Sequence, residues 1–481
     1  MTDEMLNKYE MTIGIECHVQ LATATKLFSP ADNDARDKEP NAVVHPIDYG
    51  LPGMLPVLNR EAVNLAIKAG KALNAEVARI SRFDRKHYFY PDLPKGYQTT
   101  QMYQPIIIGG HVEAPLEDGS TITVRIHHAH MEEDAGKLSH YDSYSLVDLN
   151  RAGTPLIEIV SEPDIHTAAG AKAFASELYR LMTFAGVTHG DLYHGNMRFD
   201  VNISVALKGS TVLGRRAEVK NLNSFRSVER AADYEFRRQV ELLEAGEVVV
   251  QETRGWNDAK LITTSQRSKE DAQDYRYMPD ADIPPIVLSD EEITEIQSQV
   301  PMLPSEYRAA WSGLGLDKSV VNSLLSNKDS ANAVITVQNT AGDAVARRAA
   351  HWFASVLAVE SEDVHPLDVN INPSDIIDLS LMVEKAEISS SSAKQLFAEL
   401  LAGATNPRAI ADERNMIQVS DEGEIAAVVD QVLGDPASAA SIADIQAGKD
   451  KAIGYLVGQV MKQSGGKANP ALAQKLIRER L

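Results

Sequence analysis

The character of the sequence changes near Asp290, and this change limits the folds open to the chain. Before Asp290, short runs with strand-like alternation are separated by glycine and proline, and aromatic residues are frequent. After it, alanine becomes commoner and apolar residues recur at helical spacing as far as the C-terminus. The expected strands and helices of the first part do not alternate regularly, which favours an α+β fold over a doubly wound sheet. We therefore predict an α+β domain followed by all-helical structure.

Two sequence breaks divide the chain into three predicted domains. Ser289 and Asp290, followed by two glutamates, have the pattern of a helix start with an acidic first turn. A second break lies at residues 403–407, where glycine, asparagine and proline cluster. The predicted domains are an α+β domain at residues 1–295, a helical domain at 296–405 and a small helical tail at 406–481.

Composition excludes several classes of protein. Lys and Arg number 47 against 68 Asp and Glu, a net charge of −21, so no general polyanion-binding surface is expected and nucleic acid would need a local basic patch. The single cysteine, Cys17, excludes an intramolecular disulfide and a multi-cysteine zinc site. The N-terminus has no leader pattern and no apolar run approaches ~20 residues. We expect a soluble, cytoplasmic protein.

The tail contains a local basic patch of this kind. Residues 446–481 hold seven cations and only two acids, which leaves a net charge of +5. They also contain the helix break Ser464–Pro470 (SGGKANP). Two interpretations stay open, a solvated helix end and a nucleic-acid contact.

Strands are expected at residues 9–21, 121–127, 156–160, 199–205 and 216–220, and helices at 60–73 and 168–185. In the first strand, apolar residues occupy one face, while Glu16, His18 and Gln20 share the other. The carboxylate of Glu16 and the imidazole of His18 would point the same way, ~7 Å apart. They could bind one metal ion or act as acid and base, or they could be a structural pair.

A denser cluster follows at residues 127–137 (HHAHMEEDAGK). Its three consecutive acids, Glu132, Glu133 and Asp134, need either solvent or a cation to offset their charge. Mg²⁺ suits them because it takes few carboxylates and keeps waters for exchange with phosphate. A solvated acidic turn is the alternative. Zinc fits less well, because the chain has no HExxH motif and no pair of thiolates.

Three further segments place charged residues on strands. Asp200 and Asn202 share one strand face, and so do Glu218 and Lys220. Residues 82–92 (RFDRKHYFYPD) interleave cations with aromatics. The cations could meet phosphates and the aromatics could stack on a base, or the aromatics could simply form core.

Several familiar mechanisms are excluded. The chain has no P-loop (GxxxxGK[ST]) and no GxGxxG motif. Ser391 and Lys394 match S-x-x-K, but its companion motifs are absent and a helix N-cap explains the serines better. Cys17 lies on an apolar strand face, which does not suit a glutaminase nucleophile. Any ammonia used here must therefore come from elsewhere.

Together these segments resemble the B subunits of the bacterial tRNA-dependent amidotransferases, which act on aspartyl- and glutamyl-tRNA(Asn/Gln). The resemblance covers essentially the whole chain and rests on many long motifs in the expected order. These are residues 14–21 (GIECHVQL), 26–30 (KLFSP), 83–92 (FDRKHYFYPD), 131–137 (MEEDAGK), 148–160 (DLNRAGTPLIEIV), 218–225 (EVKNLNSF), 251–254 (QETR), 274–277 (DYRY), 454–459 (GYLVGQ) and 465–470 (GGKANP).

The resemblance implies a cradle-like catalytic domain with a mixed or antiparallel sheet, then a helical domain and a YqeY-like tRNA-binding tail. It implies a ligase that uses ATP and Mg²⁺. The side-chain carboxylate of Glu-tRNA(Gln) or Asp-tRNA(Asn) is phosphorylated, and ammonia then displaces the phosphate. An amidase A subunit releases that ammonia, and a small C subunit completes a heterotrimer. The alternative is a tRNA-presenting scaffold that has lost its chemistry.

Matched motif by motif, the resemblance assigns residues to separate tasks. It assigns catalysis to Glu16, His18, Glu133 and Lys86. It assigns Mg²⁺ binding to Glu16, His18, Glu133, Asp200 and Glu218. It assigns contact with ATP to Arg85, Lys86, Lys137, Asn150 and Arg151. It assigns contact with tRNA to Lys462, Gly465, Gly466, Lys467 and Asn469. His18 has two roles open to it, metal ligand and general base.

Overall fold

The computed structural model describes residues 2–268, 274–357, 371–418, 422–447, 449–465 and 468–481. The chain forms two compact units, residues 2–307 and the described residues from Arg308 onward. The first unit is rich in sheet and the second is helical, so the predicted fold class is confirmed. Among the described residues, no helix has both the length and the apolar content that a membrane span requires.

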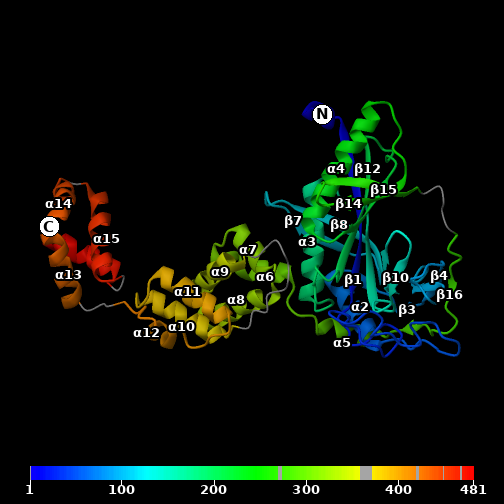
Figure 1. The fold of residues 1–481 in the computed structure, drawn as a ribbon, viewed down its shortest axis with the longest axis horizontal. Coiled ribbons are helices and arrows are strands. Elements are labelled where there is room, and N and C mark those ends of the chain that lie inside the picture. The colour runs from blue at the N-terminus through cyan, green and yellow to red at the C-terminus, as the bar shows by residue number, and fades with distance from the viewer. Residues whose placement is uncertain (1, 269–273, 358–370, 419–421, 448, 466–467) are drawn as a thin grey trace. The chain divides into compact units, whose positions relative to one another are not determined.

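A ten-stranded sheet forms the centre of the first unit (Figure 1). In spatial order its strands are β15 (Ile262–Ser268), β14 (Glu252–Asn257), β13 (Ala217–Leu222), β12 (Met197–Leu207), β1 (Tyr9–Gln20), β11 (Pro155–Ser161), β8 (Thr121–Glu133), β6 (Ile107–Ile108) and β2 (Glu76–Val77), with β7 (His111–Pro115) also paired to β8. Neighbours run antiparallel except β13 and β14, which are parallel. The sheet thus has β1 near its centre.

Helices α3 (Ala168–Phe184) and α4 (Phe225–Glu244) cover one face of this sheet (Figure 1). Ile13, Ile15 and Cys17 of β1 are buried in one core with apolar residues of both helices. The thiol of Cys17 therefore lies on the apolar face, as the alternation predicts. Because successive side chains of a strand point to opposite faces, every second residue of β1 faces away from this core. We call that side the open face.

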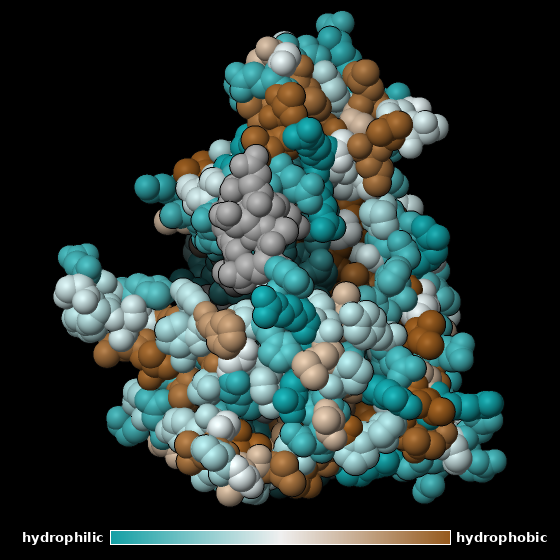
Figure 2. Space-filling view, turned by 90° about the vertical axis from the view of Figure 1, so that its right-hand side faces the viewer, coloured by the Kyte–Doolittle hydropathy of each residue, from teal (hydrophilic) through white to brown (hydrophobic). Residues whose placement is uncertain are grey.

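Smaller elements complete the first unit. β4 (Asp84–His87) pairs with β5 (Tyr97–Thr100) and β16 (Met278–Pro279), β9 (Lys137–His140) pairs with β10 (Ser145–Asp148), and β3 (Ile80–Ser81) pairs with β17 (Ile286–Val287). Helix α1 (Asp3–Leu6) precedes β1, and α2 (Arg60–Ala72) packs against α5 (Asp290–Ser298). The side of the molecule shown in Figure 2 is mostly hydrophilic, with separate apolar patches.

The second unit consists of helices. α6 (Pro304–Trp311) crosses the boundary between the units, and α7 (Lys318–Leu324), α8 (Lys328–Ala341), α9 (Asp343–Leu357), α10 (Pro373–Glu384), α11 (Ser390–Leu401) and α12 (Pro407–Glu413) follow. The tail contains α13 (Glu422–Gly434), α14 (Ala439–Gln446), α15 (Ile453–Gln463) and α16 (Pro470–Arg480). Val429, Leu456 and Ile477 belong to a core of the tail's own.

Candidate functional site

Strand pairing gathers ionisable side chains on the open face. In β1, Glu16 lies opposite Asp200 of β12, and His18 lies opposite Glu158 of β11. Glu158 in turn lies opposite His130 of β8. Directly paired residues of antiparallel strands point to the same face, so these five side chains occupy one surface.

The first of two acidic groups, here called the Glu16 group, consists of Glu16, Asp200 and Glu218. One carboxylate oxygen of each lies within 4.8 Å of the others. Asn202 donates a hydrogen bond to Glu16 at 3.0 Å. Burial raises the pKa of Glu16, and the charges of Glu158, Glu218 and Asp200 raise it further. The crowded carboxylates therefore repel one another, and a bound cation would relieve this repulsion.

Lys220 of β13 supplies positive charge to this group. Its Nζ lies 3.0 Å from Oδ2 of Asp200 and 2.9 Å from Oε1 of Glu218. Burial acts to lower the pKa of Lys220, but the charges of Asp200 and Glu218 outweigh it and the pKa is raised. The ammonium group is thus firmly held between two of the three carboxylates.

The second group, the His18 group, consists of His18, Glu132 and Glu158, whose ligand atoms also lie within 4.8 Å of one another. Nε2 of His18 lies 3.6 Å from each carboxylate. His130 lies behind them, 3.4 Å from Glu158 and 3.6 Å from Glu132. Burial acts to lower the pKa of His130, but hydrogen bonds to Glu132 and Glu158 raise it to about 10. The two carboxylates of this group thus share the His130 ring as a partner.

The carboxylates of both groups are the kind of donor that a hard divalent cation prefers, whereas the imidazole of the His18 group is a softer nitrogen donor. Mg²⁺ prefers a small number of carboxylate oxygens and retains water for exchange with phosphate. The Glu16 group offers three carboxylates, one with a raised pKa, and the His18 group offers two carboxylates and an imidazole. The donor set of the Glu16 group therefore suits Mg²⁺, and the His18 group offers it two carboxylates.

Lys86, on β4, adds a cation close to the His18 group. Its Nζ lies 5.0 Å from the centre of the Tyr275 ring. Burial acts to lower the pKa of Lys86, but the charges of Glu132 and Glu158, with Tyr277 and Tyr275, raise it. Lys86 therefore stays charged and is available to an anionic substrate.

Glu133 and Arg85 have other partners. The buried carboxylate of Glu133 forms an ion pair with Lys95 and accepts a hydrogen bond from the Thr99 N–H at 2.9 Å. Glu133 lies outside both acidic groups. Arg85 donates to Asp280 at 3.0 and 3.2 Å and to Asp282 at 2.7 Å.

Three residues assigned to ATP contact lie close to the ends of β9 and β10 in the sequence, namely Lys137, Asn150 and Arg151. The side chain of Asn150 accepts from the Val43 N–H at 2.9 Å and donates to the Glu39 carbonyl at 2.8 Å. Arg151 donates to the carbonyls of residues 135 and 136 and lies 3.3 Å from Asp134. Lys137 is exposed at the start of β9. Asn150 and Arg151 thus order loops through their hydrogen bonds.

In the tail, Lys462 is exposed near the end of α15. Gly465 has a positive φ of 63°, which favours glycine at the turn after the helix. Asn469 caps α16, accepting hydrogen bonds from the N–H groups of Ala471 and Leu472 at 3.0 and 3.1 Å. Gly466 and Lys467 lie outside the described residues.

The motif-by-motif assignment left out Glu132, Glu158, His130 and Lys220, although Glu132 and His130 belong to the cluster considered for Mg²⁺ and Lys220 was expected on one strand face with Glu218. A signal was present for three of them. His128, His130 and Glu132 have the same parity on β8, and Glu158 interrupts an apolar strand. The pairing of Glu158 with His18 requires the register between β11 and β1, which the sequence does not state.

Comparison with known proteins identifies the family of this chain. Residues 11–294 match the family described as the GatB/GatE catalytic domain, and residues 334–481 match the GatB domain. The chain belongs to the GatB family. Its relatives include the B subunit of an aspartyl/glutamyl-tRNA(Asn/Gln) amidotransferase from Alcanivorax borkumensis, 45% identical over 98% of this chain and 99% of the relative. The protein of the same name from Halorhodospira halophila is 43% identical over 98% of this chain and 99% of the relative. The family resemblance predicted from the motifs is confirmed.

Proposed function

We propose that this chain is the B subunit of an ATP-dependent tRNA amidotransferase, a carbon–nitrogen ligase that uses glutamine as its amide-nitrogen donor. It converts Glu-tRNA(Gln), Asp-tRNA(Asn) or both to the amidated forms. The observation that carries the proposal is the pair of acidic groups on one open face, with Lys86 beside them. Relatives from two bacteria that bear this subunit's name support it.

The reaction has two balanced steps. A carboxylate oxygen of the substrate side chain attacks the terminal phosphorus of ATP, which forms an acyl phosphate and releases ADP. Ammonia then attacks the acyl carbon, the C–O bond breaks, inorganic phosphate leaves and the nitrogen loses a proton. Phosphorylation is needed because a carboxylate is a poor electrophile and a phosphate is a good leaving group.

The residues of the open face have separate tasks in these steps. Glu16, Asp200 and Glu218 would hold one Mg²⁺, and His18, Glu132 and Glu158 would hold a second. When bound, the ion neutralises charge on phosphate and acyl oxygens. Lys86 attracts the anionic substrate, and His130 fixes the orientation of Glu132 and Glu158. Two roles fit His18, ion binding and acceptance of the proton that the nitrogen loses.

The remaining assignments complete the proposal. Residues 1–295 form the catalytic cradle, 296–405 the helical domain and 406–481 the YqeY-like tail, which contacts tRNA. Ammonia comes from the amidase A subunit, and a small C subunit completes the heterotrimer. Arg85, Asn150, Arg151 and Lys137 would shape the wall of the ATP site, and Glu133 would order that wall through Lys95. We place the reaction in the cytoplasm, with the tRNA substrates.

Free ammonium tests this proposal directly. The chain is assembled with its A and C partners and given Mg-ATP, ammonium and Glu- or Asp-charged tRNA, and the released amino acid is identified by chromatography. Glutamine or asparagine that forms only with ATP supports the proposal and names the substrate. If the amino acid stays glutamate or aspartate and ATP is not consumed, the proposal is overturned and the alternative, a tRNA-presenting scaffold without chemistry, is supported.

A further inference from the structure

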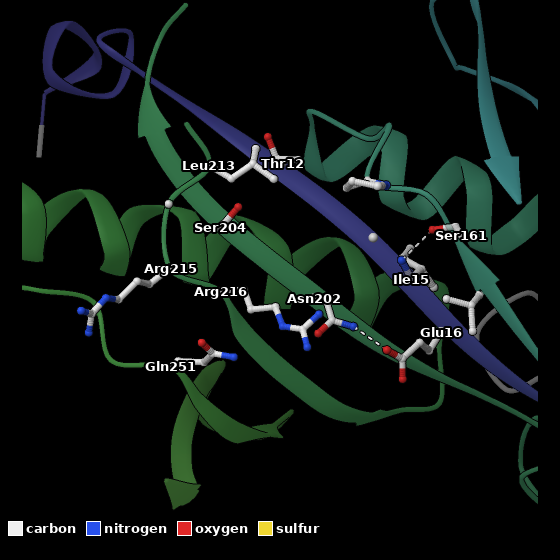
Figure 3. Close-up of a pocket in the computed structure, with 14 residues that line it drawn as sticks. Thr12, Ile15, Glu16, Ser161, Asn202, Ser204, Leu213, Arg215, Arg216 and Gln251 are labelled. Atoms are coloured by element: carbon white, nitrogen blue, oxygen red, sulfur yellow. Dashed lines mark hydrogen bonds between the residues drawn. The ribbon is translucent and has the colours of Figure 1, made fainter. Parts of the chain in front are cut away.

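A β-bulge interrupts the pairing of β8 with β11. His128 and Ile126 pair with consecutive residues of β11, so His127 is an extra residue on β8. The second of these β11 residues is Ser161, whose hydroxyl oxygen accepts a hydrogen bond from the Ile15 N–H at 2.8 Å. Figure 3 shows this bond in the wall of a pocket. The bulge is thus anchored to β1 in the centre of the sheet.

The bulge decides which side chains of β8 reach the open face. Before it, the buried apolar residues Val124 and Ile126 have even numbers, and after it the buried residues Ala129 and Met131 have odd numbers. A shift of one residue exchanges the two faces of a strand. The bulge therefore turns the even-numbered residues that follow it, the last of which is Glu132, away from the core and toward the open face.

Three imidazoles form a hydrogen-bonded row that leads from the bulge to the His18 group. Nδ1 of His127 lies 2.7 Å from Nδ1 of His128, and Nε2 of His128 lies 3.2 Å from Nδ1 of His130. The rings of His128 and His130 are nearly parallel, at 19°, with their centres 5.2 Å apart. Neighbouring residues of a regular strand point to opposite faces, so the contact between His127 and His128 depends on the bulge.

Both ring nitrogens of His130 are occupied. Nδ1 faces His128, and Nε2 lies 3.4 Å from Glu158 and 3.6 Å from Glu132. Rotation of the ring would carry Nε2 away from both carboxylates, and the contact at Nδ1 opposes that rotation. The orientation of His130 therefore depends on His128.

His128 is itself held at both of its ring nitrogens. Burial, together with the charges of His130 and His127, lowers the pKa of His128 to about 4, so the ring is neutral near pH 7. A neutral imidazole has one N–H donor and one acceptor nitrogen. The contacts with His127 and His130 use these two nitrogens, so the ring is fixed from both sides.

We infer that His128 is a positioning residue for the His18 group. It orients the His130 ring, and that ring holds the carboxylates of Glu132 and Glu158 where they can bind an ion. The inference rests on the proposed function and deepens it, because partners behind the ligands of a metal ion commonly tune its affinity. Strand packing alone would give His128 a role in stability and none in ion binding.

Titration of the full complex with Mg²⁺ in a calorimeter tests the inference without turnover. His128→Leu removes both ring nitrogens and leaves an apolar side chain of similar size. His128→Gln is the matched control, because its side-chain amide can still form a hydrogen bond with His130. Each substitution is also made together with Glu132→Gln, which removes a carboxylate that the row is inferred to position. Further readouts are Tm and, with free ammonium, the KM for Mg²⁺ and kcat.

His128→Leu should weaken Mg²⁺ binding and raise the KM for Mg²⁺ by about tenfold or more, with a smaller change in kcat at saturating Mg²⁺. His128→Gln should bind Mg²⁺ more tightly than His128→Leu. Combined with Glu132→Gln, His128→Leu should change the Mg²⁺ affinity little further, because the carboxylate it positions is already lost.

Two results would overturn the inference. One is a lower Tm in His128→Leu with the Mg²⁺ affinity and the KM for Mg²⁺ unchanged, which strand packing alone predicts. The other is an equal loss of Mg²⁺ affinity with and without Glu132→Gln. A wild-type complex that binds Mg²⁺ but forms no amide would instead overturn the proposed function, and the calorimetric comparison would still decide the role of His128.

Discussion

Glu132 and Glu133 are neighbours at the end of β8, yet their carboxylates lie on opposite faces of the strand. Glu132 points to the open face, where it meets His18 and His130 at 3.6 Å. Glu133 points the other way, to Lys95 and the backbone N–H of Thr99. Strand geometry thus separates two adjacent acids into different environments and gives them different proposed tasks.

Substitution of each acid by glutamine separates these tasks. Glu132→Gln removes a charge from the His18 group, and we expect amide formation to fall about a hundredfold or more with little change in Tm. Glu133→Gln leaves Lys95 without its charge partner and should lower the free energy of unfolding by about 1–3 kcal/mol. Ammonium-dependent amidation and thermal unfolding of the complex measure the two effects. If Glu133→Gln instead lost amidation while keeping wild-type stability, Glu133 would be a metal-site residue and its stabilising role would be wrong.

The ammonium group of Lys220 neutralises part of the negative charge that a bound metal ion would neutralise in the Glu16 group. Lys220→Met leaves the three carboxylates of the Glu16 group without their fixed cation, so the folded state should depend more strongly on Mg²⁺. We expect a lower Tm without Mg²⁺ and a larger rise in Tm than wild type when millimolar Mg²⁺ is added. Lys172→Met, which removes an ion-paired lysine from α3, is the control. An equal Mg²⁺-induced rise in wild type and Lys220→Met would contradict this account.

The fully buried Lys26 depends on Asp48, whose Oδ2 lies 3.3 Å from its Nζ. Asp48→Asn leaves this charge unpaired and should cost about 3 kcal/mol or more of unfolding free energy.

The effect of Asp48→Asn should depend on pH. Burial lowers the pKa of Lys26 in the folded protein below its unfolded value. At a pH between those two pKa values the unfolded chain binds more protons than the folded protein. The free energy of unfolding of the variant should therefore recover as the pH rises. Denaturant unfolding at neutral and alkaline pH, with exposed Asp142→Asn as control, measures both effects. A loss that is independent of pH would show that Lys26 is not the cause.

The tail offers fewer free cations than its sequence suggests. Nζ of Lys475 lies 3.7 Å from Glu422 and 3.6 Å from Glu479, whereas the side chain of Lys462 has no hydrogen bond or ion pair among the described residues. Lys462→Gln should therefore weaken tRNA binding and reduce the slope of log affinity against log salt by about 1. Lys475→Gln should change both quantities less. If the two substitutions had equal effects, the prediction that Lys462 contacts tRNA would be wrong.

Local patterns predicted many of the elements well. The strand expected at residues 9–21 is β1, the helices expected at 60–73 and 168–185 are α2 and α3, and Ser289 caps α5 as expected. The strand expected at 121–127 continues to Glu133, because histidines and acids follow its apolar part and obscure the alternation. Alternation is local, so it is visible in one sequence wherever one face is apolar.

The site was less predictable because it depends on pairing. The sequence correctly places Glu16 and His18 on one face of β1, but the partners across β1 are fixed by register. Register joins Glu16 to Asp200 and His18 to Glu158, across about 180 and 140 residues of chain. Long-range pairing of this kind reflects the packing of the whole sheet, and no motif encodes it.

The central claim is that the open face of this chain activates the substrate carboxylate. Hydroxylamine tests it most directly, because it captures a side-chain acyl phosphate as a hydroxamate. The complex would receive Mg-ATP, charged tRNA and hydroxylamine, with no glutamine, asparagine or ammonium. We predict ATP-dependent side-chain hydroxamate with wild type and its loss in Asp200→Asn, with the partner's glutaminase activity unchanged. Equal hydroxamate from Asp200→Asn, or none from wild type, would contradict the claim.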